Sequence, residues 1–86
     1  MSDKQIIIDV RYFAVLADRI GLQHERLELP CGSVVADAID VLSDTHDVIA
    51  ELRGSLATAV GRDFVPPDWL LVSHSELSLI PPVSGG

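Results

Sequence analysis

The longest helical pattern in the sequence lies near the middle of the chain, in residues 34–43. Four apolar side chains of this segment recur at intervals of three and four residues: Val35, Ala38, Ile39 and Leu42. This spacing places them on one face of a helix, with the acidic residues largely outside that face. The other apolar runs are short, and most alternate as strands do. The helix therefore has to bury its apolar face against a small sheet, which is the α+β class.

Four segments show a strand pattern between turn-forming residues: 6–12, 24–29, 56–60 and 77–80. Prolines exclude residues 65–68 from a central strand, because a proline donates no ladder hydrogen bond. The apolar residues 69–72 follow these prolines. We therefore expect them to form a hydrophobic anchor in a loop, with Trp69 as a packing residue.

Two short helical pieces are predicted in addition to the main helix, at residues 13–20 and 47–53. The apolar face of the first piece consists of Phe13, Leu16 and Ile20. Gly21 and Gly54 are suited to end the two pieces, since glycine adopts the left-handed conformation at helix ends. Ser33 is expected to be the N-cap of the main helix.

The order strand, strand, helix, strand, strand predicts a β-grasp (ubiquitin-like) fold. In that fold a small mixed sheet packs on one main helix, and the first and last strands lie side by side at its centre. The domain then spans residues 1–80, and residues 81–86 form an extended tail.

The net charge of −7, from thirteen acidic and six basic residues, argues against nucleic acid as a partner. Binding to phosphates requires a surplus of lysine and arginine. The apolar runs are also shorter than the roughly 18 residues of a membrane span, and the start of the sequence does not resemble a signal peptide. We therefore expect a cytoplasmic protein with basic protein partners and no membrane contact.

The sequence lacks the usual patterns of a metal or cofactor site. His24, His46 and His74 are scattered without ligand spacing, so no metal site is expected. No glycine-rich phosphate loop is present, and no bound cofactor is expected. The single cysteine, Cys31, excludes an internal disulfide, and its role is expected to be structural or incidental.

The end of the sequence, IPPVSGG, carries the strongest functional signal. Pro81 and Pro82 favour an extended departure from the last strand. Gly85 and Gly86 offer little steric obstruction and wide dihedral freedom. Six residues can reach about 20 Å when extended. Together these properties suit the delivery of the Gly86 carboxylate through a narrow channel into another protein.

This ending resembles the terminal PPV(S/T)GG of the MoaD family, the small subunits of molybdopterin synthase and relatives of ThiS. Residues 10–14, VRYFA, are similar to the family's first strand, which ends in (Y/F)FA. Residues 30–34 are similar to its turn into the main helix, and residues 56–60 to its middle strand. The family's DGDEV turn is altered here at residues 73–77. The resemblance covers essentially the whole chain.

The resemblance implies that Gly86 carries the chemistry. An activating enzyme of the MoeB type would use ATP to adenylate the Gly86 carboxylate. A sulfur-donor protein would then displace the adenylate and leave a thiocarboxylate. A large, MoaE-like subunit would transfer this sulfur to cyclic pyranopterin monophosphate in molybdenum cofactor biosynthesis, in a heterotetramer. The chain is not expected to be catalytic alone. Its partner's channel would receive Pro81, Pro82, Val83, Ser84 and Gly85.

Alternation along the last strand predicts the surface around the tail. Leu77 and Leu79 are expected to face the helix, and Ile80 the opposite side of the sheet. Ile80 and Phe13, together with the nearby tail, are then predicted to form an apolar surface that the partner buries.

Three other functions remain open from the sequence. A ThiS-like sulfur carrier for thiamine thiazole synthesis shares the fold and the Gly-Gly end. A ubiquitin-like modifier would transfer its activated glycine to a lysine amine instead of to sulfur. An acidic interaction domain without an activated tail is the third possibility.

Overall fold

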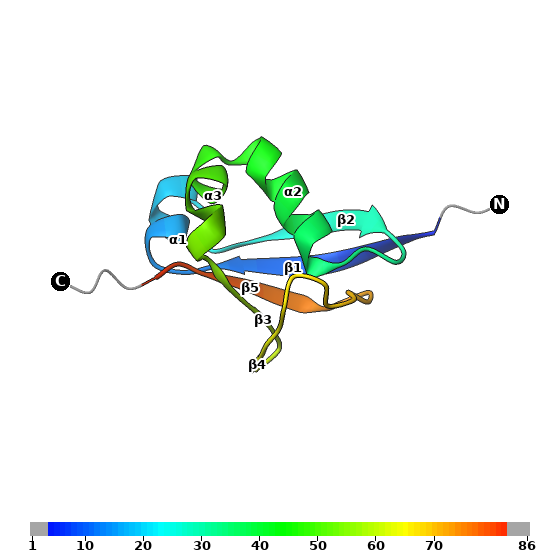
Figure 1. Cartoon of the computed structure of the whole chain (residues 1–86). Helices are drawn as coiled ribbons and strands as arrows, with labels where there is room; N and C mark the ends of the chain where they lie inside the picture. Colours follow the sequence, from blue (N-terminus) through cyan, green and yellow to red (C-terminus); the bar gives the residue numbers. More distant parts are fainter. Residues whose placement is uncertain (1–3, 83–86) are drawn as a thin grey trace.

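The first and last strands lie side by side at the centre of the sheet (Figure 1). The computed structural model describes residues 4–82. In it, β1 (Gln5–Tyr12) runs parallel to β5 (Glu76–Ile80), and Tyr12 lies opposite Leu79. The predicted central pairing is confirmed, and so is the α+β class.

Three further strands complete a mixed sheet with the order β2-β1-β5-β3-β4. β2 (His24–Pro30) is antiparallel to β1, and β3 (Ala57–Val60) is antiparallel to β5. The edge strand β4 (Asp63–Phe64) was not predicted, because two residues carry no strand period. A turn at Gly61, whose φ is 63°, joins β3 to β4 in a region that glycine adopts without steric cost.

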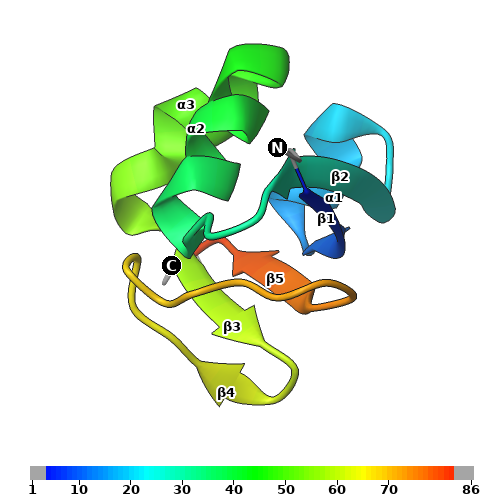
Figure 2. The same cartoon turned by 90° about the vertical axis from the view of Figure 1, so that its right-hand side faces the viewer.

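The α-helices of the described chain lie on the same side of the sheet, as Figures 1 and 2 show, and the other face of residues 4–82 has no helix over it. α1 (Val15–Ile20) joins β1 to β2, and α2 (Val35–Thr45) follows β2. α3 (Asp47–Leu52) continues into a 3₁₀ turn at Arg53–Ser55. The prediction that Gly54 ends this piece is wrong, since Gly54 lies inside the 3₁₀ turn.

The first helix begins later than predicted. Ala14 has a φ of 53°, which interrupts the helical conformation between Phe13 and α1. Phe13 is 43% exposed and lies outside the core, so its predicted place on the apolar face of this helix is wrong. Leu16 is fully buried there and Ile20 partly so. Gly21, with a φ of 85°, ends α1 as predicted.

The start of α2 differs from the predicted cap. The Ser33 hydroxyl donates to the carbonyl of Pro30 at 2.7 Å, so Ser33 is not the N-cap. Val34 occupies that position, and its N–H donates to the Asp37 carboxylate at 2.8 Å. A carboxylate in the first turn also suits the positive end of the helix dipole.

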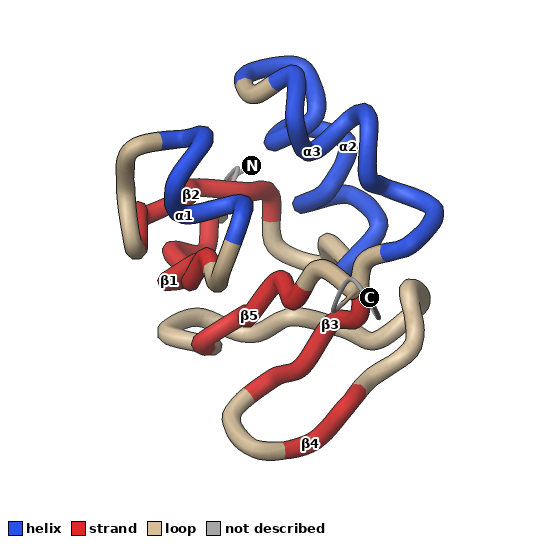
Figure 3. The backbone as a smooth tube through the Cα atoms, turned by 90° about the vertical axis from the view of Figure 1, so that its left-hand side faces the viewer, coloured by secondary structure: helices blue, strands red, loops and turns tan. Residues whose placement is uncertain are grey.

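Two further N–H groups of the first turn of α2 donate to the loop between β4 and β5. Val35 N–H donates to the carbonyl of Trp69 at 3.0 Å, and Ala36 N–H to that of Pro67 at 2.9 Å. These groups have no partner within the helix, so the loop satisfies them. Figure 3 shows this irregular segment between β4 and β5. Trp69 thus acts through its backbone. Its side chain is 46% exposed, and the buried residue of this loop is Leu71, so the packing role predicted for Trp69 is wrong.

The core lies between the helices and the covered face of the sheet. Its buried members are Ile6, Ile8, Val10, Tyr12, Leu16, Leu29, Val35, Ala38, Ile39, Leu42, Val48, Ile49, Val65, Leu71, Leu77 and Leu79. The predicted stripe of α2 is buried in full, and Leu77 and Leu79 face the core as predicted. No helix in residues 4–82 is long and apolar enough to cross a membrane.

Leu79→Ala is expected to lower the free energy of unfolding by about 2–5 kcal/mol, because it leaves a cavity in the central strand. Leu79 is fully buried, whereas Val72 is 60% exposed. Val72→Ala is the matched control, with an expected change within about 0.5 kcal/mol. Urea denaturation of both variants measures the difference. Equal destabilisation by the two substitutions would contradict the assigned core.

Candidate functional site

The site is the end of β5, where the Gly-Gly tail leaves the sheet. β5 ends at Ile80, Pro81 is buried and Pro82 is exposed. The predicted tail residues Val83, Ser84, Gly85 and Gly86 lie outside the described residues. The structure therefore defines the base of the tail and the surface around it.

Two residues predicted for this surface are brought together at the tail. Because Tyr12 lies opposite Leu79 in the parallel β1–β5 pair, the next residues, Phe13 and Ile80, are neighbours at the same end of the sheet. Phe13 is 43% exposed, and Ile80 is of intermediate exposure and lies outside the core cluster. An open pocket of about 420 Å³ borders Phe13 on its α1 side. Both side chains are thus accessible at the base of the tail.

The uncovered face of the sheet continues this apolar area across β3 and β4. Ile80 lies opposite Ala57, Ser78 lies opposite Ala59, and Ala59 lies opposite Phe64. Residues directly opposite one another project from the same face of a sheet. We call the apolar members and Phe13 the open-face patch: Phe13, Ala57, Ala59, Phe64 and Ile80.

Phe64 is the member of this patch that the sequence analysis missed. It is 74% exposed, although a large aromatic side chain is usually buried in part. The available signal was its position between the turn at residues 61–63 and the prolines that follow. A residue in that position has no strand period to carry it into the core.

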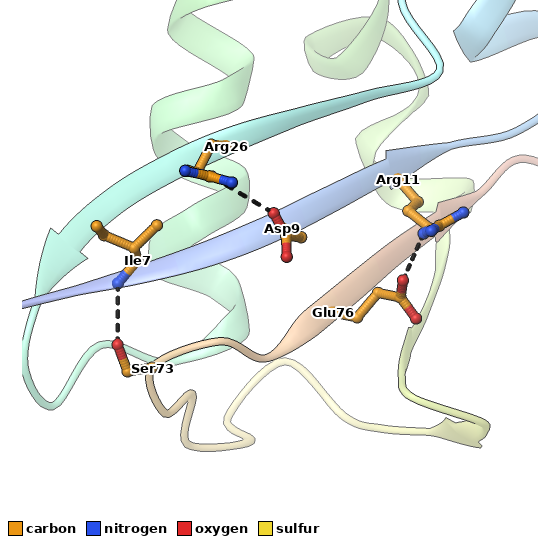
Figure 4. A network of polar contacts seen from close by, with 6 residues as sticks. All are labelled: Ile7, Asp9, Arg11, Arg26, Ser73 and Glu76. Carbon is orange, nitrogen blue, oxygen red and sulfur yellow. Dashed lines mark hydrogen bonds and ion pairs between the residues drawn. The ribbon is translucent and has the colours of Figure 1, made fainter.

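The other half of the uncovered face is polar, as Figure 4 shows. Arg11 Nε lies 2.5 Å from Glu76, and Arg26 Nε lies 3.8 Å from Asp9 on the neighbouring strand. These ion pairs are exposed, so each contributes only about 0–1 kcal/mol to stability. The Ile7 N–H donates to the Ser73 hydroxyl at 3.4 Å near the opposite end of the sheet. The uncovered face is therefore divided into a charged half on β1 and β2 and an apolar half on β3, β4 and the end of β5.

A hydrogen-bonded cluster lies on the covered side, below the end of β1. Glu25 Oε1 accepts from the Tyr12 hydroxyl and is 2.6 Å from Nε2 of His46. The rings of Tyr12 and His46 meet edge to face, with centroids 5.9 Å apart. Burial and, to a lesser extent, the hydrogen bond to Glu25 raise the pKa of Tyr12 above its ordinary value.

Within residues 4–82, no three histidine, cysteine or acidic side chains are grouped so that they could hold a metal ion. The three histidines lie in different parts of the structure, at the start of β2, at the corner between α2 and α3, and in the turn before β5. Cys31 is an exposed free thiol in the turn after β2. The chemistry of the site therefore depends on the tail and on what its surroundings bind.

Comparison with known families gives a match to the ThiS family model over residues 10–86, which includes the open-face patch and the whole tail. The chain belongs to the ThiS family. The predicted membership in the wider MoaD/ThiS group is confirmed.

Two relatives within the family have the same printed description, molybdopterin synthase sulfur carrier subunit. The chain is 30% identical to the one from Homo sapiens, over 92% of this chain and 93% of the relative. It is 28% identical to the one from Arabidopsis thaliana, over 92% of this chain and 82% of the relative. The likeness therefore extends over nearly the full length of both partners in each comparison.

Solved structures of family members confirm the β-grasp fold. A protein from Pyrococcus furiosus, described as a subunit 1 of molybdopterin converting factor, is 27% identical with a TM-score of 0.81 and covers 91% of this chain and 99% of its own. SAMP1 from Haloferax volcanii, a small archaeal modifier protein, is 26% identical with a TM-score of 0.80 and corresponding coverages of 93% and 99%.

A third structure, from Helicobacter pylori, is a complex of subunits 1 and 2 of molybdopterin-converting factor. It is 20% identical with a TM-score of 0.66, and the match covers 94% of this chain and 100% of the matched chain. At this identity the likeness concerns the fold.

The free energy of unfolding is expected to fall as the pH rises above about 10. The folded state raises the pKa of Tyr12, so it binds the phenolic proton more tightly than the unfolded chain does. This stabilisation is fully present below the unfolded pKa and is lost as the pH rises through the folded one. Urea denaturation between pH 8 and pH 11, a range chosen about this ordinary value, measures the decline. Tyr12→Phe is expected to flatten it, and an unchanged slope would contradict the assignment.

Proposed function

We propose that this chain is a sulfur carrier and serves as the small subunit of a molybdopterin synthase. The observation that carries the proposal is that the family match continues through Gly86, so the Gly-Gly end lies within the conserved family domain. The two full-length relatives described as sulfur carrier subunits of that synthase support the same conclusion.

The proposed chemistry takes place at the carboxylate of Gly86. In a MoeB-like activating enzyme, a carboxylate oxygen attacks the α-phosphorus of ATP, which forms an acyl adenylate and releases pyrophosphate. A sulfur-donor protein then supplies a persulfide sulfur that displaces AMP. After reduction of the mixed disulfide by a thiol, a thiocarboxylate remains on Gly86. ATP belongs to the activating enzyme, and this chain itself binds no cofactor.

The thiocarboxylate is then delivered to a large, MoaE-like subunit. Its sulfur attacks cyclic pyranopterin monophosphate, and two such transfers supply the two sulfur atoms of the dithiolene. Each transfer returns Gly86 to its carboxylate for a new cycle. The chain supplies the nucleophile, and the acid–base groups belong to the large subunit. A heterotetramer of two small and two large subunits in the cytoplasm accounts for this division of labour.

The open-face patch is the proposed docking surface for the large subunit. It surrounds the base of the tail, and its exposed members, Phe64 and Phe13, are aromatic side chains of the kind that concentrate binding energy in interfaces. The charged half of the same face is suited to the rim of such an interface, where charges set encounter rates more than affinity. The described complex of subunits 1 and 2 in a protein of similar fold supports a partner of this kind.

A second candidate is a ubiquitin-like protein modifier. The similarity to SAMP1 over nearly the whole chain favours it. Both functions begin with adenylation of Gly86 and differ in the acceptor, which is sulfur in one and a lysine amine in the other.

Intact mass spectrometry of the protein isolated from its own host tests the proposal. A species heavier by the difference between sulfur and oxygen, located to Gly86, is the expected result. A tagged version distinguishes the two functions. A single non-covalent partner supports the synthase, whereas a ladder of covalent conjugates without the sulfurated species would replace it with the modifier.

Removal of Gly86, or addition of one residue after it, is expected to abolish sulfur transfer and to leave the thermal midpoint unchanged. The reacting carboxylate has to reach one fixed position, and a displacement of about 1 Å can cost roughly 100-fold in rate. Product formation with the purified large subunit measures the effect. Activity of an extended protein that mass spectrometry shows to be untrimmed would contradict the role of Gly86.

Ile80→Asp and Phe64→Asp are each expected to weaken binding to the large subunit by more than about tenfold, since a charge is placed in an apolar anchor. The matched control is Val72→Asp, which alters an exposed residue near the opposite end of β5. Calorimetric titration measures affinity, and thermal melts check that each variant is folded. Unchanged affinity for both patch variants, or equal weakening by the control, would remove the open-face patch from the interface.

A further inference from the structure

The cluster of Tyr12, Glu25 and His46 has no part in the proposed sulfur chemistry, yet it is largely buried. Tyr12 is 3% exposed, and the side chains of Glu25 and His46 are 27% and 17% exposed. The same carboxylate oxygen, Oε1 of Glu25, accepts from the Tyr12 hydroxyl and from Nε2 of His46. One oxygen therefore joins the end of β1, the start of β2 and the corner between α2 and α3.

His46 has a fixed place in the helical layer. Its backbone N–H donates to Leu42 at the end of α2 at 2.8 Å, and its carbonyl accepts from Ile49 in α3 at 3.0 Å. Arg19 and Asp47 are the other charged residues near its side chain, and Arg19 is paired with Glu51. Glu25 is therefore the carboxylate that fixes the His46 ring.

The residue after Phe13 has a strained backbone. Ala14 has a φ of 53° and a ψ of −128°, which corresponds to the first central position of a type II′ turn, where glycine is usual. The Leu16 N–H donates to the Phe13 carbonyl at 3.1 Å and closes this turn. A non-glycine residue keeps such a conformation only where its surroundings hold it.

Contacts on both sides hold the turn. The Asp18 N–H donates to the Ala14 carbonyl at 3.2 Å on the α1 side. On the β1 side, the Tyr12 N–H donates to the carbonyl of Gln23 at 2.9 Å, and the Tyr12 side chain is tied to Glu25. Phe13 lies between these anchors, at the base of the tail and next to Ile80.

We propose that Tyr12, Glu25 and His46 form a brace that holds the Phe13–Ala14 turn and so positions Phe13 for docking to the large subunit. These are positioning residues, and none of them touches the reacting sulfur. The inference rests on the proposed function, because the large subunit is the docking partner. Loss of the brace lets the strained turn relax, and Phe13 then has to be ordered again at each encounter.

Steady-state kinetics with the sulfurated chain and its large subunit test the role in docking. Tyr12→Phe and Glu25→Leu are expected to raise the KM for the carrier about fivefold, the effect of one net hydrogen bond, and to leave kcat unchanged. Glu25→Gln keeps an acceptor oxygen at the same place and is expected to retain a nearly wild-type KM. Arg19→Gln, which breaks only the exposed pair with Glu51, is the matched control.

Amide NMR spectra of the free, full-length protein provide a readout that does not depend on sulfur transfer. Tyr12→Phe is expected to shift and broaden the amide signals of Phe13 and Ala14, and Glu25→Gln to leave them near their wild-type positions. Unchanged signals, or a wild-type KM in both Tyr12→Phe and Glu25→Leu, would overturn the brace. If wild-type protein forms no product at all, the proposed function fails, and the spectra alone decide whether the brace exists.

Discussion

The parallel pairing of β1 with β5 is the constraint on which the rest of this structure depends. Parallel neighbours cannot be joined by a tight turn, so the intervening chain has to leave the sheet and return. That chain supplies the helices that cover one face, and β2 and β3 then pair on the two outer sides of the central pair. The same pairing brings Phe13 and Ile80 together, because both follow the last paired residues of their strands.

The helices of the described chain cover only one face of this sheet, and the uncovered face is where the molecule is differentiated. On β1 and β2 it carries ion pairs, which keep an exposed surface soluble at little gain in stability. Toward β4 it carries small apolar residues and the exposed ring of Phe64. An apolar area at the base of the tail is costly to leave in water and is therefore better explained by a partner than by the fold of the isolated chain.

The periodic parts of the fold could be predicted from the sequence. The stripe of α2 and the alternation of Leu77 and Leu79 are repeated signals that tertiary contacts reinforce. Features made by residues far apart in the sequence could not be read in this way. The cap of α2 depends on carbonyls of Pro67 and Trp69 in a distant loop, and a local rule selected Ser33 instead. Phe64 lies in a strand too short to have a period. At the site, the tail was evident from its chemistry alone, whereas the cluster of Tyr12, Glu25 and His46 joins three separate elements and left no motif.

The position of β5 also has a consequence for how the protein is made. Of the described strands, β5 is the last to leave the ribosome, yet it forms the middle of the sheet. Its contacts with β1 are among the most distant in the sequence, so the sheet closes only after nearly all of the domain has been synthesised. A chain cut short before β5 lacks the strand that orders Ile80 beside Phe13 and β3. Such a fragment cannot present a complete docking surface, so translation errors of this kind are kept from occupying the partner.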